Sequence, residues 1–146
     1  MKNCIIANYE CVIIFLTMTV KGSRHDKKIA DESRYILPKG SNLLQDAGFQ
    51  GFCVENVFII QPVKKPKGRD LTPDEKASNR DISRVRVRIE HVISSVKRCR
   101  IVKDKFRNQL RGFADAVMEI ACALHNFRLR FRPWQKVNAK VLKKSI

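Results

Sequence analysis

The strongest constraint on the fold is the segment 83–97, whose apolar and charged residues recur at helical spacing. At about 100° per residue, one side of such a helix would carry five apolar residues, Val85, Ile89, Val92, Ile93 and Val96. Arg86, Glu90 and Lys97 would fall within about 40° of one another on an adjoining stripe. We expect a helix that buries its apolar side and presents one carboxylate among basic side chains. Taken alone, the segment fits a surface ion pair on an amphipathic helix better than a metal site at a phosphate-handling surface.

The charge of the chain indicates a polyanionic partner, most simply nucleic acid. The formal net charge is +16 over 146 residues, and the excess of bases comes from Lys64 onward, with no acid after Glu119. Hydrophobic residues make up 44% of the sequence, which is enough for a core and argues against disorder. The length suits one domain, or part of one.

The cysteines and the apolar N-terminal region each have a simple interpretation. The five cysteines are odd in number and widely spaced, without a Cys-x-x-Cys pair, and the three histidines are scattered. We expect reduced, mostly buried thiols in a cytosolic protein and no zinc site. The segment 1–20 has Glu10 in its middle and no small-residue cleavage site after it, so we expect strands there and neither a signal peptide nor a membrane helix.

The first half of the chain is expected to alternate short strands with turns and one helix. The expected elements are, in order, an antiparallel hairpin from the runs 4–7 and 11–16, a polar helix at 25–34, a turn at 38–40, and strands at 42–46 and 57–60. An exposed basic loop at 64–69 is expected to follow them.

The second half is expected to be helical. Thr72 is a predicted N-cap, Pro73 takes the first helical position, and Glu75 completes a capping box. The helix is expected to run to about Arg100, with a break near Asn79; the alternation in 84–89 would also suit a strand, but the later spacing favours a helix. A last amphipathic helix is expected over 113–124, and we expect Trp134 to pack on it at the start of a basic tail.

Four segments carry motifs in a fixed order along the chain. They are Gly-Ser-x-His-Asp at 22–26, Asp-x-Gly-Phe-x-Gly at 46–51, Leu-Thr-Pro from Leu71 with Asn79 and Ser83 after it, and Arg-x3-Glu-x6-Lys formed by Arg86, Glu90 and Lys97. Together they resemble the C-terminal catalytic part of bacterial insertion-sequence transposases of the DDE superfamily, in the branch close to Harbinger-type transposases. Ser83 departs mildly from the family, which often has Tyr at this position. The resemblance covers roughly residues 2–132.

The resemblance implies an α/β fold of the RNase H-like type, in which helices flank a mixed sheet. It divides the chain into a partial catalytic domain at 1–132 and a basic flexible tail at 133–146. The family's first catalytic Asp lies on a strand before the hairpin, and this chain starts at that hairpin. The domain would therefore be N-terminally truncated and lack the first central strand, since Asp26 and Asp31 lie on the wrong side of the hairpin to replace that Asp.

The resemblance also implies a catalytic set made of Asp46, Glu90, Lys97 and Arg86. Asp46 would be the second catalytic Asp, and it and Glu90 would each hold one of two Mg²⁺ (or Mn²⁺) ions that drive phosphoryl transfer. Arg86 and Lys97 would steady Glu90 or contact DNA phosphates. His25 and Asp26 are expected to cap a helix, although a direct catalytic role is the alternative.

The expected partners are DNA and other parts of a transposase, and no membrane. The DNA would be the terminal inverted repeats of the element and its target, bound in the bacterial cytoplasm in association with the nucleoid. The protein partner would be the upstream half of the transposase or the full-length enzyme. The residues expected to contact DNA are basic side chains at Lys64, Lys65, Lys67, Arg69, Arg84, Arg86, Arg88 and Lys97.

Three functions remain open from the sequence. The first is a fragment of a metal-dependent DNA cleavage and strand-transfer enzyme, inactive alone, which is either a degraded remnant or the second frame of an element joined by frameshifting. The second is a non-catalytic DNA-binding protein or regulator of transposition. The third, a small ribosomal-type RNA-binding protein, explains the charge but not the ordered acids.

Overall fold

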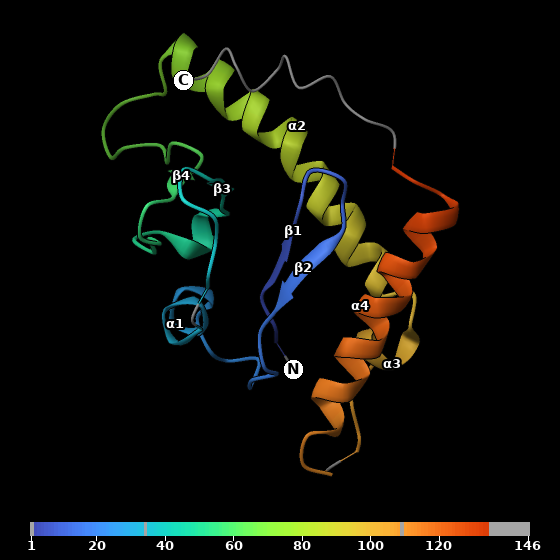
Figure 1. The fold of residues 1–146 in the computed structure, drawn as a ribbon. Coiled ribbons are helices and arrows are strands. Elements are labelled where there is room, and N and C mark those ends of the chain that lie inside the picture. Colours follow the sequence, from blue (N-terminus) through green and yellow to red (C-terminus); the bar gives the residue numbers. More distant parts are fainter. Residues whose placement is uncertain (1, 34, 109, 135–146) are drawn as a thin grey trace. The chain divides into compact units, whose positions relative to one another are not determined.

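The computed structural model describes residues 2–33, 35–108 and 110–134, which fall into two compact units (Figure 1). Unit 1 contains residues 2–24 and 88–134, and unit 2 contains residues 25–87. The boundary falls inside helix α2 (Pro73–Val96), between Val87 and Arg88. Helices and strands are mixed, as the sequence predicted. Most of the expected tail, residues 135–146, lies outside the described residues.

Unit 1 begins with the predicted antiparallel hairpin, made of β1 (Ile5–Ala7) and β2 (Ile13–Leu16). Its turn places Cys11 at φ 63°, in the left-handed region that few residues other than Gly adopt. The side-chain oxygen of Asn8 accepts hydrogen bonds from the N–H groups of Glu10 and Val12, at 3.0 and 2.9 Å. Together with backbone hydrogen bonds from the N–H of Asn8 to Val12 and from the N–H of Cys11 to Asn8, both at 2.9 Å, these bonds close the turn and hold Cys11 in its unusual conformation.

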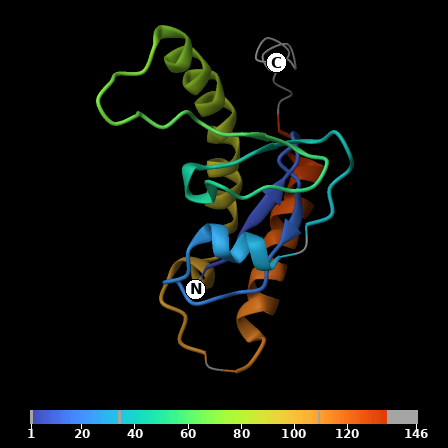
Figure 2. The same cartoon turned by 90° about the vertical axis from the view of Figure 1, so that its left-hand side faces the viewer.

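The hydrophobic core of unit 1 lies between the hairpin, the C-terminal part of α2 and helix α4 (Phe113–Phe131), which contacts β2 (Figure 2). The short helix α3 (Arg100–Lys103) contacts α4. His125 of α4 is buried, with Nε2 2.8 Å from the carbonyl oxygen of Cys11, so it joins the last helix to the hairpin turn. The buried residues of this core are Cys11, Ile13, Val92, Val96, Met118, Ala121 and Cys122.

Asn126 ties α4 to the outer edge of β2. Its side-chain oxygen accepts the N–H of Ile13 at 2.9 Å, and its side-chain nitrogen donates to the carbonyl oxygen of Ile13 at 2.9 Å. One carboxamide therefore satisfies both backbone groups of a strand residue, as a neighbouring strand would.

Unit 2 begins with helix α1 (Asp26–Glu32), which follows the N-cap residue His25. The strands β3 (Asn42–Leu44) and β4 (Phe58–Ile60) pair in parallel, and the 3-10 helix η1 (Ala47–Phe49) follows β3. Because the pairing is parallel, both strands deliver the residues after them to the same edge. The helix and both strands were predicted, and the parallel pairing is a new finding.

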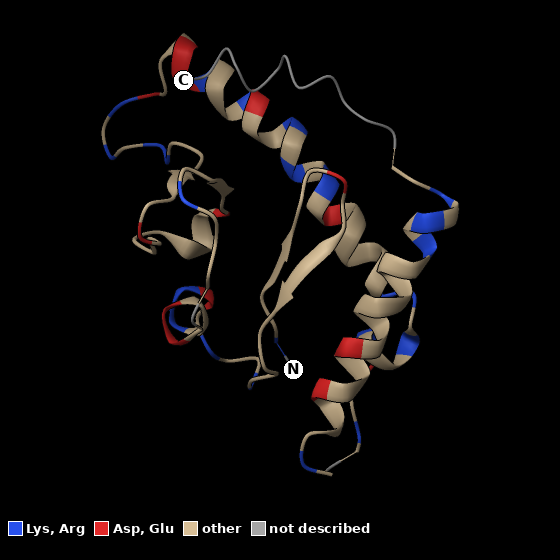
Figure 3. Ribbon diagram, viewed as in Figure 1, with Lys and Arg blue, Asp and Glu red and all other residues tan. Residues whose placement is uncertain are grey.

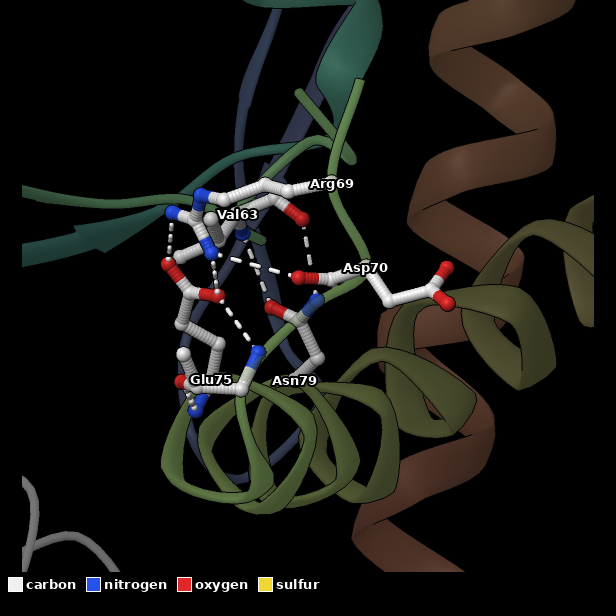
Figure 4. A network of polar contacts seen from close by, with 6 residues as sticks. Val63, Arg69, Asp70, Glu75 and Asn79 are labelled. Carbon is white, nitrogen blue, oxygen red and sulfur yellow. Dashed lines mark hydrogen bonds and ion pairs between the residues drawn. The ribbon is translucent and has the colours of Figure 1, made fainter. Parts of the chain in front are cut away.

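The N-terminus of α2 forms the predicted capping box (Figure 4). The hydroxyl of Thr72 accepts the N–H of Glu75 at 3.2 Å, and the Glu75 carboxylate accepts the N–H of Thr72 at 2.8 Å. Arg69 donates to both Glu75 oxygens, at 2.9 and 2.8 Å. The Arg69 hydrogen bond, with that from the Thr72 N–H, lowers the pKa of Glu75 to about 2.

Helix α2 is continuous from Pro73 to Val96, so the expected break near Asn79 is wrong. The Asn79 side chain turns outward instead: its oxygen accepts the N–H of Val63 at 2.8 Å, and its nitrogen donates to the Val63 carbonyl oxygen at 2.9 Å (Figure 4). Since the carboxamide is engaged outside the helix, it does not compete for the helix's own backbone hydrogen bonds.

The ring of Trp134 lies against His91 of α2, with ring centroids 5.0 Å apart, and its expected packing on the last helix stays a prediction. That last helix is longer than its apolar pattern indicated, because it continues to Phe131. Among the described residues, no helix is both long and apolar enough to cross a membrane.

Candidate functional site

Asp46 lies just beyond β3, at the edge where the parallel strands end. Its backbone is extended, and its Oδ1 accepts the N–H of Ala47 at 2.7 Å, which caps η1. Strand pairing continues up to this point, since the N–H of Gln45 donates to the carbonyl oxygen of Ile60 at 2.9 Å. The Asp46 side chain is 54% exposed. The residue therefore begins a turn and also holds a carboxylate open to solvent.

The glycines after Asp46 are explained by close packing and by backbone conformation. A Cβ at Gly48 would lie 3.1 Å from Oδ2 of Asp26, the first residue of α1, so a larger residue at position 48 would require this acid to shift by a few tenths of an ångström. Gly51 has φ +80°, which disfavours any residue with a side chain. Asp26, the last residue of the motif at 22–26, thus packs against the motif at 46–51 within unit 2. Asp26 is in the first turn of α1, as expected, although the His25 side chain makes no cap hydrogen bond.

Arg86 contacts Asp46 through both terminal guanidinium nitrogens, an arrangement that the sequence did not predict. Nη1 lies 3.4 Å from Oδ1, and Nη2 donates to Oδ2 at 3.4 Å. Both distances are long for a charge-assisted hydrogen bond, and both side chains are partly exposed, so the pair is weak. A weak pair can hold the carboxylate in place and still release it to a stronger ligand.

Glu90 and Lys97 lie in unit 1, on or directly after the part of α2 that the core anchors. Glu90 is exposed on the helix, whereas Val92 and Val96 nearby are 1% and 2% exposed. The helix ends at Val96, and exposed Lys97 follows, with its N–H bonded to the carbonyl oxygen of Ile93 at 2.9 Å. The predicted division into a buried apolar stripe and an exposed charged stripe is confirmed for these residues.

Asp46 and Glu90 suit a hard divalent cation by their chemistry, because both offer exposed carboxylate oxygens and Mg²⁺ prefers such oxygens while keeping several waters. Asp46 belongs to unit 2 and Glu90 to unit 1. In the part of the chain that the structure describes, no group of three or more His, Cys, Asp or Glu side chains is arranged to hold a metal ion. Metal binding by these two carboxylates therefore stays a prediction.

The basic loop before α2 is exposed, as predicted, but half of its cations already have partners (Figure 3). Lys65 forms an ion pair with Asp70, and Arg69 holds Glu75 at the start of α2. Lys64 and Lys67 form no ion pair with any residue that the structure describes. Of the four predicted DNA contacts in this loop, these last two are the better candidates.

The predicted DNA contacts Arg84 and Arg88 on α2 have different surroundings. Arg84 is exposed and lies 3.3 Å from Asp81 in unit 2. Arg88 lies over the ring of Tyr9 in unit 1, 5.1 Å from its centroid, and its Nε and Nη1 atoms are shielded from solvent. Burial raises the pKa of the Cys11 thiol, and the Arg88 guanidinium beside it offsets part of this rise. Arg88 therefore has a structural role at the hairpin, which the sequence did not reveal.

Comparison with known proteins identifies what the chain is similar to. The family described as DDE superfamily endonuclease matches residues 1–126. A probable transposase for insertion sequence element IS702 from Microchaete diplosiphon is 30% identical over 112 residues. That alignment covers 77% of this chain, and the chain spans only 40% of the relative. No solved structure matches the chain.

Proposed function

This chain belongs to the DDE superfamily endonucleases, and from that premise we propose that it forms the part of an insertion-sequence transposase that carries the second and third catalytic carboxylates. Asp46 is the proposed second carboxylate and Glu90 the third, on an RNase H-like domain. The observation that carries the proposal is the exposed carboxylate of Asp46, presented at the end of parallel strands and contacted by Arg86. Glu90 follows Arg86 one helical turn later along α2, a rise of about 6 Å.

The proposed chemistry is hydrolysis of a DNA phosphodiester followed by strand transfer. Bound Mg²⁺ or Mn²⁺ ions would activate the attacking oxygen and stabilise the leaving oxygen. Asp46 and Glu90 would each hold one ion. Arg86 would keep the Asp46 carboxylate oriented before an ion binds, because its 3.4 Å contacts are too weak to block exchange. Lys97, exposed at the end of α2, would contact a DNA phosphate.

We expect this chain to need a partner that supplies the first carboxylate. By family resemblance that Asp precedes the hairpin, and these 146 residues hold no counterpart. Mg²⁺ has few protein ligands, so each carboxylate contributes much of the affinity. The proposed partner is the upstream half of the transposase or the full-length enzyme, and the proposed substrates are the inverted repeats and the target DNA.

A nicking assay tests the proposal. The chain alone, with Mg²⁺ or Mn²⁺ and DNA that carries the terminal repeats, should not nick. Addition of the upstream half alone, without the second and third carboxylates, should give metal-dependent nicking, which Asp46→Asn or Glu90→Gln should each bring to background. Glu119→Gln, which alters an exposed acid of α4, is the matched control and should leave nicking intact.

Two results would contradict the proposal. Nicking by the chain alone that is lost in Glu90→Gln would show that the first carboxylate is dispensable. Nicking by the complemented protein that survives Asp46→Asn would remove Asp46 from the catalytic set.

The net charge of +16 favours a second candidate function, a non-catalytic DNA-binding protein or regulator of transposition. Binding to DNA that requires no metal, is weakened by salt and is unchanged by Asp46→Asn and Glu90→Gln would support it, provided that complementation also gives no nicking.

A further inference from the structure

A basic hollow lies in unit 1 where α2 ends and α3 begins. Its volume is about 580 Å³, and it is a shallow hollow that is open to solvent. Four cationic side chains line this hollow. The sequence indicated one of them, Lys97, for DNA contact, and it did not indicate the other three. The residues that line it are Ser94, Lys97, Arg98, Arg100, Lys103 and Asp104.

The local sequence explains why these cations converge. Apolar residues recur at Val96, Cys99 and Val102, and all three pack in or against the core of unit 1. The bend between α2 and α3 is thereby fixed, and the basic residues between the apolar ones are left exposed on the outer side. The cations are therefore held on a segment that the core supports, and not on a free tail.

The charge of the hollow is strongly one-sided. Four cationic side chains face one carboxylate, that of Asp104, which lies 3.4 Å from Nε of Arg100. Like charges held close together repel one another, and an anion that enters the hollow relieves this repulsion. The single acid offsets only part of the positive charge.

We propose that this hollow binds the phosphodiester backbone of DNA. Two guanidinium groups match the oxygens of a phosphate in a bidentate manner, Lys103 and Lys97 add point charges, and the hydroxyl of Ser94 is a further donor. The lining offers no aromatic ring on which a base could stack. The contact therefore positions DNA without reading its sequence. The inference rests on the proposed function for the identity of the polyanion.

The test compares two triple variants of the full chain with the same net charge. One combines Arg98→Gln, Arg100→Gln and Lys103→Gln, and leaves Lys97 in place. The control combines Lys21→Gln, Lys28→Gln and Lys39→Gln, which replace exposed lysines far along the sequence from the hollow. Binding to two unrelated DNA duplexes is measured over a range of salt concentrations in the presence of a chelator, so that metal binding at Asp46 and Glu90 has no influence.

We expect the hollow variant to lose two or more phosphate contacts. Each contact contributes about 0.9 to the slope of log affinity against log salt, or roughly fivefold in affinity at 0.15 M salt. The hollow variant should therefore bind both duplexes roughly thirtyfold more weakly, with a slope lower by about 2. The control should lose less than about threefold, because charges beyond about 8 Å are screened at this salt concentration.

A variant that is expected to strengthen DNA binding tests whether misfolding explains the weaker binding of the hollow variant. Asp104→Asn removes the one carboxylate of the hollow and should tighten DNA binding by about threefold, whereas Glu119→Gln, at an exposed acid on α4, should change it less. Equal losses in the two triple variants, no tightening by Asp104→Asn, or a loss confined to RNA would each overturn the inference. Failure of nicking after complementation, with these binding differences intact, would overturn the catalytic proposal alone.

Discussion

Asn126 in unit 1 and Asn79 in unit 2 make the same pair of hydrogen bonds in different surroundings. Each carboxamide accepts the N–H and donates to the carbonyl oxygen of one distant residue, Ile13 or Val63, at 2.8 to 2.9 Å. Ile13 is a buried core residue, whereas Val63 is 40% exposed. The same chemistry thus reinforces a core in one unit and fastens an exposed segment in the other.

The two proposed catalytic carboxylates are likewise supported in different ways, one in each unit. Glu90 is on a helix that the apolar core of unit 1 anchors through Val92 and Val96. Asp46 follows a strand of three residues, and polar contacts such as that between Gln61 and Gln45, at 2.7 Å, hold its surroundings. We expect substitutions in the core to affect unit 1 most, and changes in pH or polar partners to affect unit 2.

The largest expected difference in stability comes from replacing the side chains of Asn126 and Asn79, one variant at a time. Asn126→Ala would leave the N–H and the carbonyl of buried Ile13 without partners and should lower the free energy of unfolding by roughly 3 kcal/mol. Asn79→Ala should cost about 1 kcal/mol or less, because water can replace its bonds to Val63. Urea denaturation of each variant measures the difference. Equal losses of unfolding free energy in the two variants would show that the burial of the bonded residue does not matter, and would contradict the difference drawn between the two units.

A smaller effect is expected from two valines of the same helix. Val92 is 1% exposed in the core of unit 1, and Val87 is 46% exposed in unit 2. Val92→Ala should lower the free energy of unfolding by roughly 2 kcal/mol through a cavity. Val87→Ala should change it by less than about 0.5 kcal/mol, since Ala is also the better helix former. A large cost at Val87 would mean that unit 2 depends on an apolar contact there.

The smallest expected effect is a pH dependence at the capping box of α2. The pKa of Glu75 is lowered from 4.5 to about 2, chiefly by the hydrogen bond from Arg69. The carboxylate therefore stabilises the fold above about pH 4.5, and this contribution is lost as the pH falls from about 4.5 through 2. The difference in thermal stability between the wild type and Glu75→Gln should be constant above pH 5 and shrink across this interval.

An Arg69→Gln background provides the control for the pH experiment. Because Arg69 is the largest cause of the lowered pKa, the interval over which Glu75 affects stability should narrow in this background. An unchanged profile would mean that the bond from the Thr72 N–H is sufficient by itself.

Features that depend on neighbours in the sequence were predictable. The capping box of Thr72 and Glu75, the hairpin, the strands and the buried stripe of α2 all follow from spacing over a few residues. The position of Asp46 at the end of a strand also follows from local pattern. These features reflect backbone preference and amphipathic periodicity, which act over one or two turns.

Features that join distant residues could not be predicted from one sequence. A break in the helix was expected near Asn79, yet the Asn79 carboxamide bonds to the backbone of Val63, 16 positions earlier, and does not compete for the helix's own hydrogen bonds. The contact of Arg86 with Asp46 and the approach of Asp26 to Gly48 likewise depend on tertiary packing. The motifs indicated which residues matter, but not which of them touch.

The division of unit 1 into two stretches of sequence has a consequence for its synthesis on the ribosome. The hairpin can pack only after helix α4 has been synthesised, because Asn126, which bonds to Ile13 of the hairpin, is 113 positions further along the chain than Ile13. All of unit 2 emerges in between, so the apolar strands leave the ribosome long before their cover exists. Such distant pairing slows folding and leaves the nascent hairpin open to wrong partners, including other nascent chains.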